Sequence, residues 1–218
     1  MSIHTLIYDG NELFGFGRNM EGQLGLRDYI NRNVPTLIMT DKTIQKIICK
    51  YKHTFILKES GELFTCGNNF YGQLGLSDNN YRIVPTLIMT DKTIRKIICG
   101  WKHTFILEES GKLFAFGSND NGQLGLGDNN DRNVPTLMMT DKTIRKIVCG
   151  WDHTLIFKES GELFAFGYNY NGQLGLGDNN NRNIPTLLMT DKTIRKIVCG
   201  GNHTFILKES GELFAFWS

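Results

Sequence analysis

The chain repeats itself every 50 residues, and this period constrains the fold more than any other feature of the sequence. One position of the repeat holds all four prolines, Pro35, Pro85, Pro135 and Pro185. The five histidines recur at nearly the same interval, as His4, His53, His103, His153 and His203. Self-similarity at a period of this length is typical of solenoids, propellers and other repeat arrays.

Four short segments of the unit read as β-strands, as the third copy shows. They are 134–139 (VPTLMM), 144–149 (IRKIVC), 153–157 (HTLIF) and 162–166 (ELFAF), and they are rich in β-branched and aromatic residues. TDKT and KESG carry the Asp, Ser and Gly of tight turns, and Gly161 suits the left-handed position of a hairpin loop. No segment has helical periodicity. Four antiparallel strands per unit predict an all-β fold, a β-propeller.

Length and composition agree with one domain. With 218 residues and 40% hydrophobic content, the chain can bury a core, and no linker-like stretch interrupts it. We expect a single repeat domain over 1–218. It comprises a half-blade at 1–17 and four repeat units that form about four complete four-stranded blades, at 18–67, 68–117, 118–167 and 168–218.

The sequence points to an intracellular protein, cytoplasmic or nuclear. The first residues lack the basic and apolar regions of a signal peptide, and no apolar run approaches the ~18 residues of a membrane span. Equivalent cysteines on successive blades are expected to lie too far apart to pair, so we predict free, buried thiols. These cysteines are Cys49, Cys99, Cys149 and Cys199.

The repeat resembles that of the regulator-of-chromosome-condensation family. The elements that carry the resemblance are ELFAFG, GQLGLGD, VPT and CG-x-x-HT, which occur together along the whole chain. The resemblance implies a β-propeller, seven-bladed in the founding member, which catalyses guanine-nucleotide exchange on a small nuclear GTPase and binds nucleosomes. Many relatives use the repeat as a docking platform. The founding member relies on a basic N-terminal tail and a wedge-like insertion, and we find neither here.

Three sets of repeated residues could suggest chemistry, but each has a structural explanation. The glycine-rich loops lack the following helix of a phosphate-binding loop, and we expect Leu74, Leu124 and Leu174 to plug between blades. Histidines on separate blades cannot converge on zinc. The Asp-Asn runs lack the bidentate Glu of a calcium loop, and we expect them to form turns through hydrogen bonds to their own backbone. An active site is normally one asymmetric pocket, whereas every candidate here is copied several times. We predict no catalytic residue, metal or cofactor, and no enzymatic activity.

The charge pattern gives no sign of a nucleic-acid-binding surface. The net charge is +2, and in each unit the basic TDKTIRK segment is followed by KESGE, which nearly cancels it. We therefore expect a solvated rim of mixed charge and no nucleic-acid partner.

The copies differ at one end of the blades. If strands alternate in direction, TDKT and KESG lie on one face, which is nearly invariant. The loops before each histidine and the glycine-rich loops, which we expect to cross between blades, lie on the other. Exposed aromatic side chains with neighbouring charge are typical of protein-binding surfaces, although such rings can also cover blade edges. The candidate partner-binding residues on this variable face are Tyr51, Phe70, Tyr71, Trp101, Lys102, Trp151, Asp152, Tyr168 and Tyr170.

We therefore interpret the chain as a non-enzymatic protein-interaction module. The alternative is an exchange factor or other regulator of a small GTPase, and a third reading is a degenerate repeat protein without independent function. Four and a half blades fall short of seven, so we expect either an open arc with apolar ends, which favours self-association, or a strained small ring of about five units.

Overall fold

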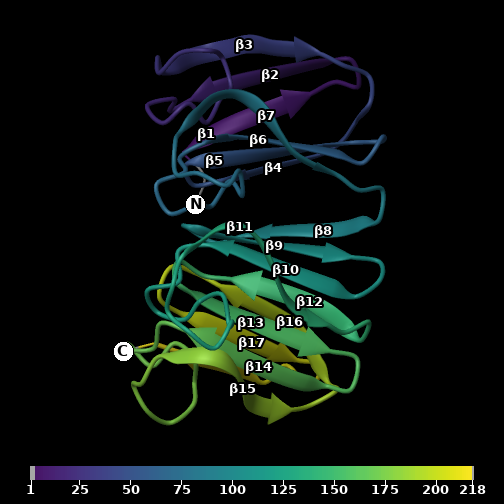
Figure 1. Cartoon of the computed structure of the whole chain (residues 1–218). Coiled ribbons are helices and arrows are strands. Elements are labelled where there is room, and N and C mark those ends of the chain that lie inside the picture. The colour runs from purple at the N-terminus through teal and green to yellow at the C-terminus, as the bar shows by residue number, and fades with distance from the viewer. Residues whose placement is uncertain (1–2, 218) are drawn as a thin grey trace.

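The computed structural model describes residues 3–217, which form eighteen β-strands in five antiparallel sheets. The sheets follow one another along the chain and stack like propeller blades (Figure 1), which confirms the all-β propeller-type fold.

The first sheet contains β1 (His4–Tyr8), β2 (Glu12–Gly17) and β3 (Arg32–Thr40). The second contains β4 (Ile44–Lys50), β5 (His53–Lys58), β6 (Glu62–Gly67) and β7 (Arg82–Thr90). The third contains β8 (Ile94–Cys99), β9 (His103–Glu108), β10 (Lys112–Gly117) and β11 (Arg132–Thr140). The fourth contains β12 (Ile144–Cys149), β13 (His153–Lys158), β14 (Glu162–Gly167) and β15 (Arg182–Thr190). The fifth contains β16 (Ile194–Cys199), β17 (Thr204–Lys208) and β18 (Leu213–Phe216).

The long Gly-Gln-Leu-Gly loop lies within a sheet, and our expectation that it crosses between blades is wrong. In the second sheet it joins β6 to β7, which pair directly, with Phe64 opposite Leu87. The Thr-Asp-Lys-Thr turn makes the step to the next sheet instead, from β7 to β8. Each repeat unit therefore gives its first strand to the preceding sheet. The eighteen strands are distributed as three, four, four, four and three.

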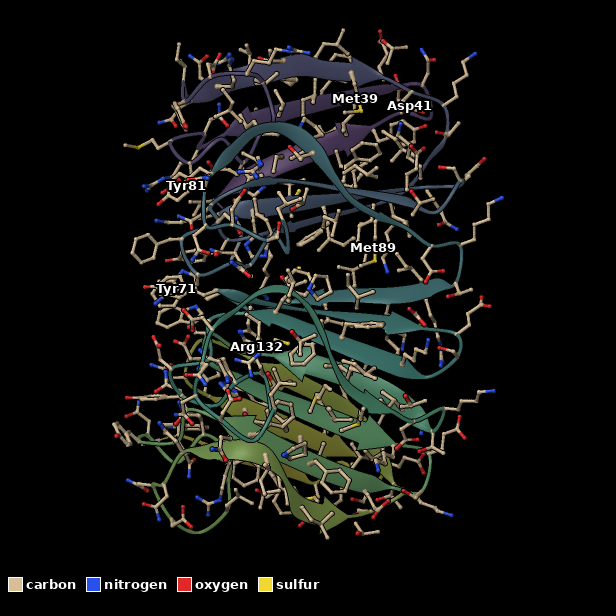
Figure 2. The ribbon with its side chains drawn as sticks, viewed as in Figure 1. Met39, Asp41, Tyr71, Tyr81, Met89 and Arg132 are labelled. Atoms are coloured by element: carbon tan, nitrogen blue, oxygen red, sulfur yellow. The ribbon has the colours of Figure 1, made fainter. Side chains whose placement is uncertain are left out.

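The two faces of the blades are nevertheless those that the sequence predicts. An ion pair of 2.9 Å between Asp41 Oδ2 and Lys58 Nζ joins the TDKT turn that leads into the second sheet to the KESG turn within that sheet. We name this end of the sheets the turn face. The long loops and the turns before each histidine lie at the other end, the loop face. Figure 2 shows Asp41 at one edge of the molecule and Tyr71 and Tyr81 at the opposite edge.

Apolar side chains fill the space between neighbouring sheets. Between the third and fourth sheets, Phe105 and Leu113 face Ile156 and Phe166, and all four side chains are buried. Leu124 enters the same cluster from the long loop of the third sheet and is completely buried. The predicted plug between blades is thus confirmed, and full burial of such a side chain is worth about 1.5–3 kcal/mol.

The long loops also dock on the next sheet through their backbones. Ser77 N donates to Asn133 O of β11 at 2.8 Å. Gly72 has a φ of +79°, and a Cβ at this position would lie 2.5 Å from the Asn133 Cα. A side chain would therefore push the loop away, so the close approach depends on glycine.

The arc is open, and its two end sheets expose apolar surface, which excludes the small closed ring. Ile7 in the first sheet is 48% exposed and Leu213 in the fifth is 60% exposed, whereas the equivalent Ile106 and Leu113 of the third sheet are fully buried. The Trp217 ring stacks on Phe205 at 5.5 Å, where internal sheets place a phenylalanine of the next sheet. The apolar ends expected of an open arc are therefore present.

Candidate partner-binding face

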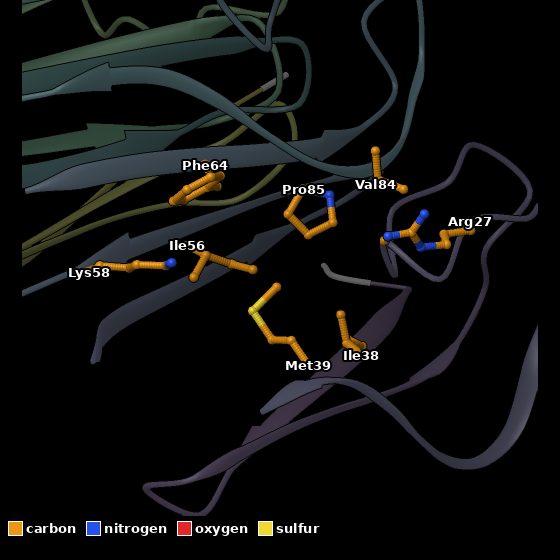
Figure 3. Close-up of a pocket in the computed structure, with 9 residues that line it drawn as sticks. Arg27, Ile38, Met39, Ile56, Lys58, Phe64, Val84 and Pro85 are labelled. Atoms are coloured by element: carbon orange, nitrogen blue, oxygen red, sulfur yellow. The ribbon is translucent and has the colours of Figure 1, made fainter. Parts of the chain in front are cut away.

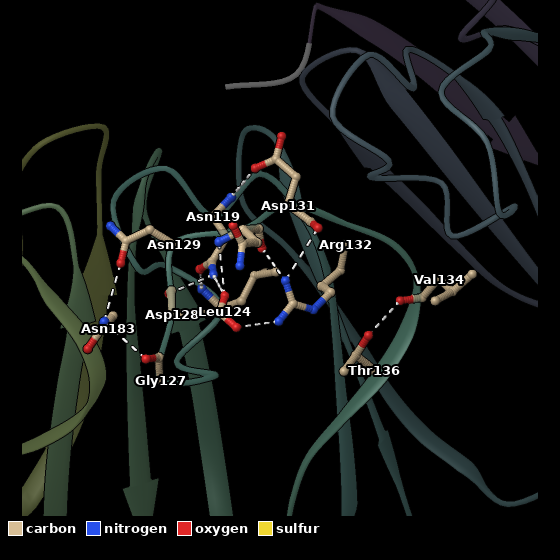
Figure 4. Close-up of polar contacts among 11 residues, drawn as sticks. Asn119, Leu124, Gly127, Asp128, Asn129, Asp131, Arg132, Val134, Thr136 and Asn183 are labelled. Atoms are coloured by element: carbon tan, nitrogen blue, oxygen red, sulfur yellow. Dashed lines mark hydrogen bonds and ion pairs between the residues drawn. The ribbon is translucent and has the colours of Figure 1, made fainter.

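The loop face rests on a rigid polar scaffold. In the third sheet the Asn119 side chain donates to the Asp128 backbone carbonyl at 2.9 Å and accepts from Leu124 N at 2.9 Å (Figure 4). Arg132 Nη2 and Asp128 Oδ2 form an ion pair at 2.5 Å. The same ion pair recurs as Arg32–Asp28, Arg82–Asp78 and Arg182–Asp178. Asp and Asn thus serve the turns, as predicted, and the loops hold their exposed side chains in place.

Three rings of the predicted site form a continuous row across successive sheets. The Tyr51 and Trp101 ring centroids lie 5.4 Å apart, and those of Trp101 and Trp151 lie 5.5 Å apart. The Trp151 ring then packs against the backbone of Gly201, where a Cβ would lie 2.8 Å from the indole. Trp151 is 41% exposed, whereas Tyr51 and Trp101 are half-buried. The Tyr51 and Trp101 rings therefore pack against their neighbours and also leave part of their surface open to solvent.

Lys102 connects this row to a second aromatic pair. Its Nζ lies 4.0 Å from the Trp101 ring centroid and 4.5 Å from that of Tyr71, and Tyr71 contacts Phe70 at 5.0 Å. Cation–π contacts of this kind orient the ammonium group without neutralising it. Phe70 is 62% exposed. Six of the nine predicted residues therefore form one connected cluster: Tyr51, Phe70, Tyr71, Trp101, Lys102 and Trp151.

Four residues of this cluster, Phe70, Tyr71, Trp101 and Lys102, line a hollow of about 280 Å³ between the second and third sheets. We name it the Lys102 hollow. Its rim includes Tyr81, which is 38% exposed, and Lys52, whose Nζ is paired with Glu21 Oε1 at 2.8 Å. The lining residues are Lys52, Asn68, Phe70, Tyr71, Gln73, Tyr81, Trp101 and Lys102. Exposed rings around a charged group give the hollow both apolar area and a polar contact.

The remaining three predicted residues lie outside this cluster. Tyr168 and Tyr170 stack on each other at 5.2 Å, and Tyr170 is 64% exposed. Burial raises the pKa of the Asp152 carboxyl; the Lys102 ammonium opposes this shift, and the neighbouring Asp120 carboxylate adds to it. Gln123 Nε2 donates to Asp152 Oδ1 at 3.3 Å. Asp152 is therefore mostly enclosed, and it adds negative charge beside the hollow rather than a contact surface.

Sequence reasoning missed several exposed apolar side chains on the loop face. Met20 is 58% exposed and occupies the same repeat position as Phe70 and Tyr170, so comparison of the copies could have found it. Tyr29 and Ile30 are 52% and 66% exposed, where later copies have asparagine. The divergence of the copies therefore extends along the whole face.

The histidines belong to a buried polar ladder between sheets. His103 Nε2 lies 3.1 Å from Thr154 Oγ1 of the next sheet, and that hydroxyl donates to the Gln123 carbonyl at 3.0 Å. Burial lowers the pKa of His53 and His103 to about 3. Equivalent histidine contacts join His4 to Thr54 and His153 to Thr204. His4, His103 and His153 thus each contact a different threonine, and within residues 3–217 no three His, Cys, Asp or Glu side chains gather as metal ligands would.

The cysteines are free thiols, as the sequence predicts. Cys66, Cys99 and Cys149 are buried, while Cys49 and Cys199 are partly buried. Burial raises the pKa of the Cys99 thiol to about 12, so it is protonated at neutral pH. These thiols act as small apolar side chains between the sheets.

A second cavity of about 310 Å³ lies between the first and second sheets (Figure 3). Met39, Ile56, Phe64 and Pro85 supply much of its lining, and the Lys58 ammonium there is already paired with Asp41. A smaller gap of about 50 Å³ occurs at the equivalent place between the fourth sheet and its neighbour. Because equivalent residues line both gaps, we attribute them to the way successive repeats pack and not to a specific binding site.

Comparison with known proteins identifies the family. The chain matches the RCC1-like domain over residues 2–217, and it therefore belongs to the RCC1-like domain family. Comparison with curated protein sequences gives no match. No helix in the described part of the chain is long and apolar enough to cross a membrane.

Solved structures agree with this assignment at the level of the fold. Human WBSCR16 is 23% identical with a TM-score of 0.81, covering 99% of this chain and 59% of that one. Yeast RCC1 (Prp20), solved bound to Kap60, is 20% identical with a TM-score of 0.83, covering 98% of this chain and 54% of that one. The chain thus spans a little over half the length of these relatives.

Proposed function

We propose that the protein is a non-enzymatic interaction module that binds a protein partner at the Lys102 hollow. The observation that carries this proposal is the connected cluster of aromatic rings around one ammonium group. Lys102 forms none of the ion pairs found among residues 3–217, and its side chain is only half-buried. Asp131 and Asp152 act on this ammonium from beyond ion-pair distance, so a partner carboxylate can contact it without displacing either of them.

The surrounding rings define the chemistry of the partner. Phe70 and Tyr81 at the hollow, and Trp151 beside Trp101, offer exposed apolar area with few rotatable bonds, which is a favourable composition for a binding surface. The partner segment should therefore carry an acidic side chain flanked by apolar ones. Asp120 and Asp152 next to the hollow would repel a second acidic group on that side and so restrict the orientation.

Charge reversal in the hollow tests the proposal. Lys102→Glu should weaken capture of the partner from a lysate of the source organism by roughly 30-fold, because hot-spot changes commonly cost about 2 kcal/mol or more. Lys142→Glu makes the same charge change on the turn face, where Lys142 is exposed, and should leave capture unchanged. Equal capture by both variants would show that the hollow does not bind the partner.

The double replacement Trp101→Ala with Trp151→Ala extends the test to the rings. It should abolish capture while the circular dichroism spectrum is retained. Loss of the spectrum would show that the row is needed for folding, in which case Lys102→Glu alone decides the proposal.

Guanine-nucleotide exchange is the alternative that this proposal competes with. A structure of yeast Prp20p is described with its binding to Gsp1p and histones, but that chain is 22% identical and is 52% covered, so the likeness concerns the fold. A release assay with labelled nucleotide on captured small GTPases distinguishes the two functions. Faster release at catalytic amounts of this protein would favour the exchange factor.

A further inference from the structure

The inner edge of the arc concentrates positive charge. The first strand of each later sheet lies there, since β8 and β12 contact each other, as do β12 and β16. These strands read IQKIICK, IRKIIC, IRKIVC and IRKIVC, without an acidic residue, although the whole chain has a net charge of only +2. Their cations are Lys46, Lys50, Arg95, Lys96, Arg145, Lys146, Arg195 and Lys196.

Five of these cations surround one cavity of about 320 Å³. It lies at the turn-face end of the inner strands and is therefore separate from the Lys102 hollow. Phe157, Ile194 and Ile197 supply an apolar floor, and Arg145 lies over the Phe157 ring at 5.8 Å. The cations are Lys96, Arg145, Lys146, Arg195 and Lys196. A volume of this size accommodates a small molecule.

No acidic side chain neutralises the cavity. None of its five cations takes part in an ion pair among residues 3–217. Two acids of the turn face pair with other lysines, Asp141 with Lys158 at 2.9 Å and Asp191 with Lys208 at 3.1 Å. The mixed-charge rim that the sequence suggests therefore excludes the Ile-Arg-Lys positions.

Two of the lysines are fixed by the neighbouring sheet. Lys96 Nζ donates to Arg145 O at 2.9 Å, and Lys146 Nζ donates to Ile197 O at 2.9 Å. Each ammonium keeps two further donors. Burial lowers the pKa of Lys146, and the nearby Lys196 acts in the same direction, which reflects the crowding of like charges. An anion bound here would relieve that repulsion.

We propose that this cavity binds a small molecule that carries two or more linked phosphate groups. Neighbouring carboxylates on one side of an extended peptide are separated by about 7 Å and carry one charge each. Linked phosphates place more charge in a smaller volume, and the planar guanidinium of Arg145 or Arg195 matches two phosphate oxygens at once. The apolar floor would contact the non-phosphate part of the ligand.

Calorimetric titration of the intact chain with tripolyphosphate tests this proposal, at roughly physiological ionic strength, so that weak surface attraction is screened. We expect saturable binding with one molecule per chain. Arg145→Gln and Lys146→Gln should each weaken it about tenfold, because each removes a charge-assisted hydrogen bond. Lys142→Gln removes the same charge outside the cavity and should have no effect.

Four results would overturn the proposal. The first three are the absence of saturable binding, equal weakening by Lys142→Gln, and displacement of tripolyphosphate by sulfate at the same concentration, which would show a simple ion site only. A hexaglutamate peptide is the last arm. If it binds more tightly than tripolyphosphate and through Arg145, the cavity serves an acidic protein segment instead. Thermal unfolding of each variant confirms that it is folded.

Discussion

The space between the sheets and the loop face have diverged to different extents. Between sheets, the same leucine plug is fully buried in the third and fourth copies, as Leu124 and Leu174. On the loop face, one repeat position holds Met20, Phe70, Asp120 and Tyr170 in turn. The side chains between the sheets pack each sheet on the next, so a change there disturbs a closely packed interface. The loop face carries no such constraint, so it is where copies of one repeat can acquire different contacts.

The polar ladder of the interior should make the fold sensitive to acid. Burial lowers the pKa of His4 and His153 to about 4 and of His53 and His103 to about 3, so these rings are neutral in the folded state. Below pH ~6.5 the unfolded chain takes up protons that the folded chain does not, and stability therefore falls as the pH falls from about 6.5 towards 4. The free energy of unfolding should drop by about 1 kcal/mol or more per histidine and pH unit.

Urea unfolding at pH 7, 6 and 5 measures this effect. His153→Asn should make the pH dependence shallower, because it removes one of these buried rings. An unfolding free energy that stays constant between pH 7 and pH 5 would show that the ladder does not contain neutral buried histidines.

The interior should also be intolerant of truncation. Leu124→Ala leaves a cavity in the cluster between the third and fourth sheets and should lower the free energy of unfolding by about 2–5 kcal/mol. Leu137→Ala makes the same change at a side chain of the outer strand that is 51% exposed, and should cost much less. Similar losses in the two variants, measured by urea unfolding, would contradict the contrast between interior and surface.

The outer faces of the two end sheets carry apolar side chains that other sheets bury against a neighbour. We therefore expect these faces to associate with a second copy of the chain. Leu213 is 60% exposed, and its burial against a second copy would contribute about 1.5–3 kcal/mol. Light scattering coupled to gel filtration should therefore show a mass above 24.8 kDa for the chain and a smaller mass for Leu213→Glu. Leu187→Glu, at a side chain 50% exposed on the outer edge, is the control. A wild-type monomer would rule out association.

One interior site departs from the repeat and should respond to repair. Gly100 packs against the His103 ring so closely that a Cβ would overlap it, but the first copy has Lys50 at this position. Neither ring nitrogen of His53 has a hydrogen-bond partner among residues 3–217. Lys50→Gly should let His53 reach the next sheet and raise the free energy of unfolding by about 1 kcal/mol. Lys50→Ala keeps the Cβ and should leave the free energy of unfolding unchanged. If urea unfolding shows the same gain for Lys50→Ala as for Lys50→Gly, the gain comes from removing the lysine charge.

The sequence predicted the strands, the turns and the two faces because these follow from local patterns. It did not predict that the strand containing Val84 and Pro85, β7, belongs to the second sheet. A repeat has the same sequence pattern wherever its start is placed, so the division into sheets is decided only by the pairing of β7 with β6. The cluster around Lys102 was found in part, because its rings vary among copies. The sequence analysis missed that Arg145 and Lys146 lie apart from acidic side chains. Asp141 is close to them in the sequence, but its side chain pairs with Lys158 and not with either of them.

The central claim is that the loop face binds a protein partner, and photo-crosslinking tests it most directly. A photoreactive phenylalanine analogue in place of Phe70, which is 62% exposed at the Lys102 hollow, should give one crosslinked partner that disappears when Lys102→Glu is added. The same analogue in place of Leu187, on the outer edge, should give none. A partner that crosslinks from Leu187 as well as from Phe70, or that crosslinks from Phe70 regardless of Lys102, would contradict the assignment of binding to this face.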